Sequence, residues 1–273
     1  MSYPKTLRLL NLKNTDMIGR KFSFLLMLFT FLIFSISIVQ AQSTVCIVYF
    51  TGIGCPNCGV TDPIILAELP KNYSNLIVME YELYKEPENP SIMNDYVSSY
   101  NLYPGVPQVL FDQAKNFVGR IDVLKTEEEI NKTNNNSCPL KDGSAVDFND
   151  LDITSLLGHP KIWARGRVLM SSGANSGDSD LLKDILMADD ISEVLNGIEY
   201  ETIKPIAVEF SNKKVEFKHA IKLGDWVLEW EEKESEQGGT DWSLYFIGGI
   251  SVFLFVIISI IIYKKYKIKV KLK

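Results

Sequence analysis

Histidine is nearly absent from this chain, which has only His159 and His219 among its 273 residues. Histidine is the commonest protein metal ligand and a frequent general base. Two histidines in different sequence contexts therefore argue against a metal cluster or a histidine-based catalytic site. Cysteine is also scarce, with four residues, of which Cys55 and Cys58 have the spacing of half a zinc site. No second such pair and no neighbouring histidine completes four ligands, so we expect neither a metal nor a cofactor.

Basic residues are sparse in the body of the chain. Residues 22–263 contain 17 Lys and Arg against 33 Asp and Glu, a net charge of −16. A body this acidic repels phosphate backbones, which excludes nucleic acid as an expected partner. The other eleven basic residues lie in residues 1–21 and 264–273, which together hold one acid, Asp16.

An apolar run near the N-terminus, FSFLLMLFTFLIFSISIV, follows five basic residues. It ends at Val39-Gln40-Ala41, a small-residue pattern typical of signal-peptide cleavage. We predict that residues 1–41 are a signal peptide cut after Ala41. The alternative is an uncleaved anchor, because the 18 apolar residues are just long enough to span a bilayer.

A second apolar run, residues 242–263, has no charge and carries tryptophan and tyrosine at its ends. These features are typical of a transmembrane helix with interfacial aromatic residues. The six lysines of residues 264–273 predict a basic cytoplasmic tail, so the body faces outside the cytoplasm. We therefore expect a single-pass protein of the cell membrane, with residues 233–241 as its juxtamembrane linker.

Residues 43–137 alternate strand and helix patterns and predict an α/β fold. The expected strands are 44–50, 75–83, 108–111 and 117–124, and the helical segments are a stretch that begins within residues 55–58, with Cys58 one turn inside it, 92–102 and 126–132. A βαβ unit followed by a β-hairpin and a closing helix makes a four-stranded mixed sheet covered on both faces.

The segment YFTGIGCPNC, residues 49–58, resembles the Y-F-x-G-x-G-C-P-x-C start of small exported or membrane-bound thioredoxin-like proteins. Gly105-Val106-Pro107, which opens the third expected strand, adds to the resemblance, and together they cover residues 43–137. The resemblance implies a thioredoxin-like βαβαββα domain. It also implies a cis bond between Val106 and Pro107 that turns the backbone of Val106 toward Cys55, where substrate binds.

The expected chemistry is thiol-disulfide exchange. A helix N-terminus stabilises a thiolate, so we predict that Cys55 is the exposed nucleophile. Cys58, one turn further along, would resolve the mixed disulfide. Pro56 stiffens the active-site turn, and the neutral Asn57 predicts a less oxidising pair than one with histidine between the cysteines. The alternative is a degenerate domain in which the two cysteines form a buried structural bridge.

One departure from the family concerns proton transfer. Thioredoxins have a buried aspartate near the end of the first strand that relays the proton of the resolving cysteine, and Tyr49 stands at that position here. We therefore expect resolution by Cys58 to be slower or differently assisted.

The predicted function is that of a membrane-anchored extracytoplasmic oxidoreductase acting on exported proteins with thiols or disulfides. The membrane segment has no cysteine, so recycling requires a separate redox partner in the membrane. The alternative is a non-catalytic thioredoxin-like protein that binds or assembles partners at the surface.

The C-terminal part of the body is less informative. Residues 138–150 are expected to be a linker and residues 151–232 a small α+β or β-rich accessory domain. Its expected elements are strands at 161–170, 205–210, 215–223 and 226–230 and a helical stretch 181–195 broken near Asp189-Asp190. His219 is expected in the core and His159, before Pro160, in a turn.

Two cysteines remain outside the motif. Cys46 lies near the start of the first expected strand, and Cys138 follows the last helix of the four-stranded unit, so the topology places both on one side of it. In an exported chain these two are predicted to form a structural disulfide. The alternative is that Cys46 is a small buried hydrophobic residue and Cys138 a loop thiol.

Overall fold

The computed structural model describes residues 43–158, 160–171, 177–210 and 214–231. The chain divides into two compact units, Met1–Ser43 and Thr44–Lys273, and nearly all of the described residues belong to the second. His159, the linker 233–241, the tail 264–273 and both apolar runs, predicted as a signal peptide (1–41) and a transmembrane helix (242–263), lie outside the described residues. Within the described ranges, no helix is both long enough and apolar enough to span a membrane.

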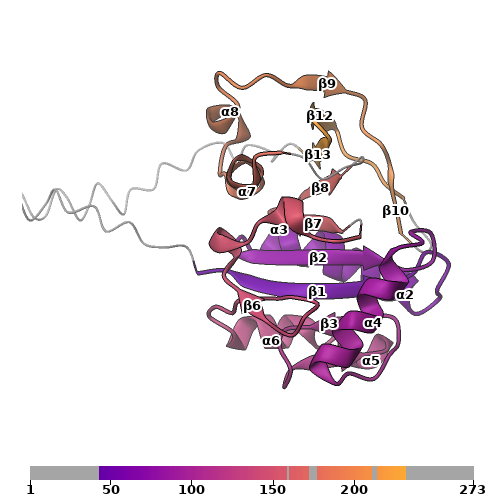
Figure 1. Ribbon diagram of the computed structural model, residues 1–273. Helices are drawn as coiled ribbons and strands as arrows, with labels where there is room; N and C mark the ends of the chain where they lie inside the picture. The colour runs from indigo at the N-terminus through magenta and orange to yellow at the C-terminus, as the bar shows by residue number, and fades with distance from the viewer. Residues whose placement is uncertain (1–42, 159, 172–176, 211–213, 232–273) are drawn as a thin grey trace, which may run out of the picture. The chain divides into compact units, whose positions relative to one another are not determined.

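Nine strands form one mixed sheet in the order β4-β3-β1-β2-β7-β8-β13-β12-β9 (Figure 1). β1 (Val45–Thr51) runs parallel to β2 (Leu76–Glu82), and every other neighbouring pair is antiparallel. The remaining seven strands are β3 (Gln108–Leu110), β4 (Asn116–Val118), β7 (Lys161–Ala164), β8 (Arg167–Ser171), β9 (Glu201–Ile203), β12 (His219–Leu223) and β13 (Trp226–Trp230). The fold is therefore mixed α/β with a large mixed sheet.

Helical segments contribute side chains to the two hydrophobic cores that cover this sheet. They are α2 (Cys58–Asp62), a π-helical turn (Pro63–Glu68), α3 (Leu69–Asn72), α4 (Asn89–Tyr100), α5 (Arg120–Val123), α6 (Thr126–Lys132), α7 (Ser179–Met187), α8 (Ile191–Val194) and 3-10 turns at Phe148–Asp150 and Ile153–Ser155. Two small ladders, β5 (Cys138–Pro139) with β6 (Ala145–Val146) and β10 (Val208–Glu209) with β11 (Lys214–Val215), complete the described structure.

Alternate side chains of β1 enter two different hydrophobic cores, as the period of two of a strand requires. Cys46, Val48 and Phe50 pack in the core that includes residues of α4 and α7. Ile47 and Tyr49 pack in the core that includes the helical run after Cys58 and Ile130 of α6. Because both faces of β1 are covered, all seven of its residues are buried.

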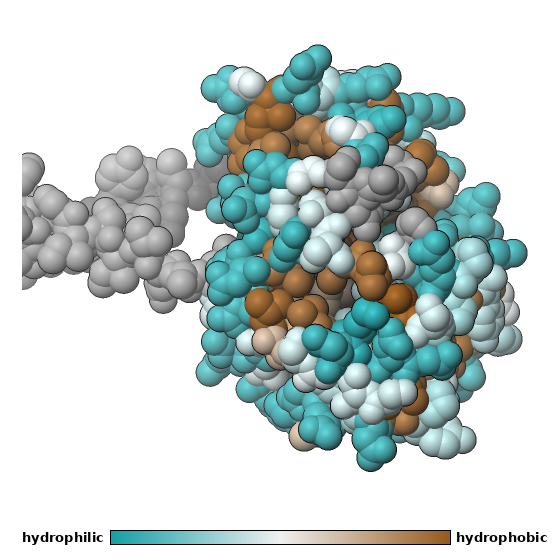
Figure 2. All heavy atoms as spheres, viewed as in Figure 1, coloured by the Kyte–Doolittle hydropathy of each residue, from teal (hydrophilic) through white to brown (hydrophobic). Residues whose placement is uncertain are grey.

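The surface around these cores is mostly polar. Figure 2 shows hydrophilic residues over much of the face in view, interrupted by hydrophobic patches. The large hydrophobic side chains that stay exposed in the described residues are Val60, Tyr84, Tyr103, Ile121, Leu124, Leu157, Tyr200 and Ile206. Scattered exposure of this kind is normal for a folded surface.

Several predicted boundaries are corrected by the structure. The fourth strand ends at Val118, and residues 120–123 form α5 because Gly119, at φ 80°, turns the chain out of the sheet. The single strand predicted at 161–170 is a hairpin of β7 and β8 whose turn residues, Arg165 and Gly166, both have positive φ. The predicted break in the helical stretch 181–195 is confirmed, since α7 ends at Met187 and Asp190 caps α8.

The last predicted strands are also shorter than expected. Residues 205–210 contribute only β10, and 215–223 divides into the end of β11 and β12. His219 is only partly buried, and its ring stacks on Trp230 with centroids 5.3 Å apart.

The strands of residues 161–230 join the same sheet as those of residues 45–118. β7 pairs with β2 in antiparallel register, with Val78 opposite Trp163 and Glu80 opposite Lys161. The segment predicted as an accessory domain thus continues the sheet that carries the cysteine motif.

Candidate active site

The Cys55–Cys58 turn lies between the end of β1 and the start of α2. The backbone carbonyl of Cys55 accepts the N–H of Gly59 at 3.0 Å, and its sulfur accepts the N–H of Cys58 at 3.3 Å. The Sγ atom of Cys55 thus accepts the N–H of the first residue of α2, whose N-cap position is occupied by Asn57. The prediction placed Cys58 one turn inside the helix. In the structure it is the first residue of α2.

The two thiols differ in burial. Cys55 is 8% exposed and Cys58 is 0% exposed. The predicted exposed nucleophile is therefore largely covered, although it is the only one of the pair with accessible surface. Burial raises the pKa of Cys58 to about 12, and its hydrogen bond to the Cys55 side chain acts in the same direction. The nearby Thr51 side chain acts in the opposite direction and lowers this pKa.

The bond between Val106 and Pro107 is cis, as predicted from the resemblance. Pro107 precedes β3, whose first residue, Gln108, pairs with Phe50 of β1. Continued by one residue, this antiparallel register places Pro107 opposite Thr51. Val106 and Pro107 thus lie at the end of β1 from which the chain leaves for Cys55.

The predicted disulfide between Cys46 and Cys138 is present, with Cα atoms 4.8 Å apart. Both residues are fully buried. The Asn136 side chain bonds the backbone of Cys46 from both sides, accepting from its N–H at 2.9 Å and donating to its carbonyl at 2.7 Å. Cys46 and Thr51 are five residues apart in β1, about 17 Å along a strand, so this bridge is remote from the Cys55 turn.

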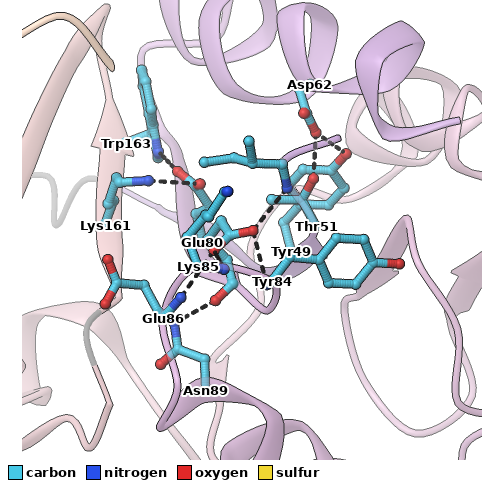
Figure 3. A network of polar contacts seen from close by, with 12 residues as sticks. Tyr49, Thr51, Asp62, Glu80, Tyr84, Lys85, Glu86, Asn89, Lys161 and Trp163 are labelled. Carbon is cyan, nitrogen blue, oxygen red and sulfur yellow. Dashed lines mark hydrogen bonds and ion pairs between the residues drawn. The ribbon is translucent and has the colours of Figure 1, made fainter. Parts of the chain in front are cut away.

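A buried carboxylate that the sequence reading missed lies behind Cys58. Asp62, 1% exposed, accepts hydrogen bonds at Oδ1 from Tyr49 Oη at 2.8 Å and from Thr51 Oγ1 at 2.6 Å (Figure 3). The Tyr49 hydroxyl also bonds Thr61 Oγ1 at 2.8 Å. Burial and the charge of Asp62 raise the pKa of Tyr49 well above its ordinary value, so Tyr49 remains a neutral donor. The signal in the sequence was the four-residue spacing of Cys58 and Asp62.

A second buried carboxylate, Glu82, holds the loop before the motif. Its Oε1 atom accepts the backbone N–H of Ile53 at 2.7 Å and of Tyr84 at 2.9 Å, and its Oε2 atom accepts those of Lys85 at 2.5 Å and Glu86 at 3.1 Å. Figure 3 labels three of the residues that supply these N–H groups, Tyr84, Lys85 and Glu86. Glu82 therefore joins the loop that leads to Cys55 to the loop that follows β2.

The ring of Tyr84 lies against the same loop. A Cβ atom at Gly52 would be 2.8 Å from the Tyr84 ring, so a larger residue there would have to displace this ring. Tyr84 itself stays 58% exposed. Partial burial and the charges of Cys55 and Cys58 raise its pKa.

The third buried carboxylate, Glu80, connects β2 to β7. It accepts from Lys161 Nζ at 3.0 Å and from Trp163 Nε1 at 2.6 Å (Figure 3). Burial raises the pKa of Glu80, and Lys161 opposes that shift. Glu80 and Glu82 stand at alternate positions of the apolar strand LIVMEYE, which the sequence reading treated only as a strand.

These side chains form a thiol site backed by carboxylates and hydroxyls. Within the described residues, no group of three or more histidine, cysteine, aspartate or glutamate side chains is placed to hold a metal ion. No protein-family model, no curated protein and no solved structure matches this chain, so the comparisons place it in no family.

Proposed function

We propose that this chain is an extracytoplasmic, membrane-anchored thiol-disulfide oxidoreductase that acts on proteins through Cys55 and Cys58. The observation that carries the proposal is the unequal environment of the two sulfurs. Cys55 Sγ accepts a helix N–H and keeps some accessible surface, whereas Cys58 is sealed and its pKa is raised. A nucleophile needs a stabilised thiolate within reach of substrate, and a resolving cysteine needs only to reach the nucleophile.

The surrounding fold supports a thioredoxin-like module. The first four strands of the sheet and the helical segments between and after them follow the expected βαβαββα order, with the short α5 added before α6. The cis bond at Val106–Pro107 and the Cys55 turn both lie at the end of β1 that the resemblance implies.

The chemistry proceeds by two exchanges. The Cys55 thiolate attacks a substrate disulfide, forms a mixed disulfide and releases one substrate thiolate. The Cys58 thiolate then attacks Cys55 Sγ, forms the Cys55–Cys58 disulfide and releases the second substrate thiolate, so that two electrons pass from the chain to the substrate. In the opposite direction the same steps oxidise a substrate dithiol, and a separate redox partner in the membrane restores the starting state.

Two single substitutions test the proposal. Cys55→Ser should abolish exchange with a disulfide-bonded protein, and Cys58→Ser should accumulate a mixed disulfide that mass spectrometry detects. Asn57→Ala is a control in the same turn that keeps both thiols and should remain active. Turnover by Cys58→Ser at the wild-type rate would contradict the dithiol mechanism. If Cys55 reacts with neither substrate disulfides nor alkylating reagents, a non-catalytic role in binding partner segments replaces the proposed one.

Export and membrane anchoring are part of the same proposal; export rests on the apolar run 22–39 and anchoring on the hydropathy of residues 242–263. The full chain should stay in the membrane fraction after alkaline extraction, and a chain ending at residue 241 should be released. Release of both would contradict the anchor.

A further inference from the structure

Three triplets of the chain have the pattern Asn-x-Ser/Thr, in which x is any residue except proline. This pattern marks an asparagine that accepts an N-linked glycan on an exported protein. The triplets begin at Asn72, Asn131 and Asn135, and all three asparagines are exposed. Asn89-Pro90-Ser91 has the excluded proline, and its asparagine is 0% exposed. The fold therefore exposes the asparagines that fit the pattern and buries the one that the proline excludes.

We propose that Asn72, Asn131 and Asn135 carry N-linked glycans, which cover the end of the body at which β1 begins. This modification is separate from the thiol chemistry, but it rests on the outward-facing body that is part of the proposed function. Such triplets also arise by chance, so their shared place in the fold carries the inference rather than their number.

The first two acceptor sites lie beside each other. Asn72 is the last residue of α3, and Asn131 is the last residue but one of α6. Tyr73, which follows Asn72, donates from its hydroxyl to Asn131 Oδ1 at 3.1 Å. The Nδ2 atom of Asn131, to which a glycan attaches, is not part of this bond.

The third acceptor site lies at the same end of the sheet. Asn135 is exposed in the segment between α6 and β5. The next residue, Asn136, donates its backbone N–H to the carbonyl of Thr44 at 3.1 Å. Asn75, in the loop that follows the first site, accepts the N–H of Val45 at 2.9 Å. Because β1 begins at Val45, all three sites surround the start of this strand.

The thiol site lies at the other end of the same strand. β1 extends from Val45 to Thr51, about 20 Å, and the chain reaches Cys55 four residues later. In Figure 1 the chain enters β1 at the left, and α2, which begins at Cys58, lies near its right-hand end. Glycans around the start of β1 would therefore leave the approach to Cys55 open.

The exposed hydrophobic side chains follow the same division. Val60 lies in α2, the Tyr84 ring lies against Gly52, and Tyr103 is three residues before Val106. In the described residues, no large exposed hydrophobic side chain belongs to the segments 71–75 and 131–137. A bulky polar glycan at those segments covers no apolar surface that a partner protein would bind.

The modification is a glycosyl transfer from a lipid-phosphate-linked oligosaccharide, catalysed outside the cytoplasm by a membrane-bound glycosyltransferase. The asparagine Nδ2 atom forms a bond to the anomeric carbon of the first sugar and loses one proton to a base. The bond between that carbon and the donor phosphate oxygen breaks, and its electron pair stays on the phosphate.

The full chain, purified from membranes of its source organism, tests the assignment. Peptide mapping by mass spectrometry should find a glycan on each of the three asparagines. Asn135→Gln should remove one glycan, whereas Asn134→Gln, at an exposed neighbour outside the triplets, is the matched control and should remove none. Thr133→Ala should leave Asn131 unmodified, and Thr133→Ser should preserve its glycan.

The variant Asn72→Gln/Asn131→Gln/Asn135→Gln should exchange disulfides within about twofold of the wild-type rate, because its three sites are remote from Cys55. A larger change in the folded variant would show that the glycans reach the thiol site, against the proposal.

Export is measured separately, by adding protease to cells freed of their wall. An asparagine without a glycan on a chain whose body is digested would overturn the assignment of that asparagine, and would leave the proposed function intact. A body that is digested only after lysis would instead overturn the outward-facing placement and, with it, the proposed function.

Discussion

Glu82 is 2% exposed, and its carboxylate binds four backbone N–H groups from two loops. In Glu82→Gln the new NH₂ group would face two of these donors, leaving buried groups unpaired. We expect the free energy of unfolding to fall by about 2 to 4 kcal/mol, as measured by denaturant titration. Glu88→Gln, at an exposed carboxylate six residues after Glu82, is the matched control and should change stability by less than about 0.5 kcal/mol.

The raised pKa of Cys58 makes the stability of the folded state depend on pH in the alkaline range. An unfolded Cys58 loses its proton near its ordinary value of 9.0, whereas the folded one keeps it up to about 12. The folded state therefore binds the extra proton in this range, and stability falls as pH rises through it. Carbon-13 NMR of the cysteine Cβ atoms, with only the Cys55–Cys58 pair reduced, should show Cys58 titrating above pH 11.

Cys46 and Cys138 supply internal controls for that titration, because disulfide-bonded cysteines do not titrate. An inflection of the Cys58 signal at or below pH 9 would contradict the predicted protonation. Cys58→Ser should also reduce the loss of stability between pH 9 and pH 12 relative to the wild type, since it removes one of the groups that titrate there.

At the residue scale, the disulfide could be predicted from the positions of Cys46 and Cys138 in the expected topology, and the cis bond from the Val106-Pro107 pair of the resemblance. The buried carboxylates were not predicted. Glu80 and Glu82 occupy positions where a strand normally places apolar residues. Glu80 binds Lys161, which is 81 residues away, and one of the backbone N–H groups that Glu82 binds belongs to Ile53, 29 residues away. Composition and periodicity do not encode such partners, so only coordinates reveal them.

The elements themselves were predicted best where their signals are local. The strand at β1 and the helix Thr126–Lys132 agree with the structure within a residue, because β-branched runs and acidic first turns mark them. The hairpin of β7 and β8 was read as one strand because both of its strands are apolar. The only residues that mark the turn are Arg165 and Gly166. They are a weak turn signal because arginine rarely adopts positive φ.

That hairpin turn yields a prediction for one glycine. Gly166 has φ 72°, where a Cβ atom is strained, although the space beside it would allow ordinary contact with Lys71 at 3.7 Å. Gly166→Val should therefore destabilise the chain by about 1 to 2 kcal/mol in a denaturant titration. Gly166→Asn is the control, because asparagine tolerates this conformation. An equal loss for both substitutions would show that packing, not backbone conformation, sets the requirement.

At the scale of the whole molecule, the Cys46–Cys138 bridge links positions 92 residues apart. Closing a loop of this length restricts the unfolded chain by about 4 to 5 kcal/mol in the entropic description. The double variant Cys46→Ala/Cys138→Ala should lose stability on this order in a denaturant titration. The pair Cys55→Ser/Cys58→Ser is the control and should lose much less. A bridge-free variant as stable as the wild type would contradict the prediction.

The sequence did not predict that the strands of residues 45–118 and of residues 161–230 form one sheet. Each half shows its own strand pattern, and residues 138–150 resemble a linker. Which strand pairs with β2 depends on long-range register and on the Glu80 bonds to Lys161 and Trp163. The class of fold was therefore predictable, but the continuity of the sheet was not.

The order of this sheet also determines what it offers to other chains. Its outermost strands in the described residues are β4 and β9, each three residues long. An edge strand with free backbone groups invites strand addition and aggregation, and short edge strands limit the hydrogen bonds that an incoming chain gains. The long, apolar strands β1 and β2 sit at interior positions of the sheet, paired on both sides. In the folded state, β1 and β2 therefore cannot pair with strands of another chain.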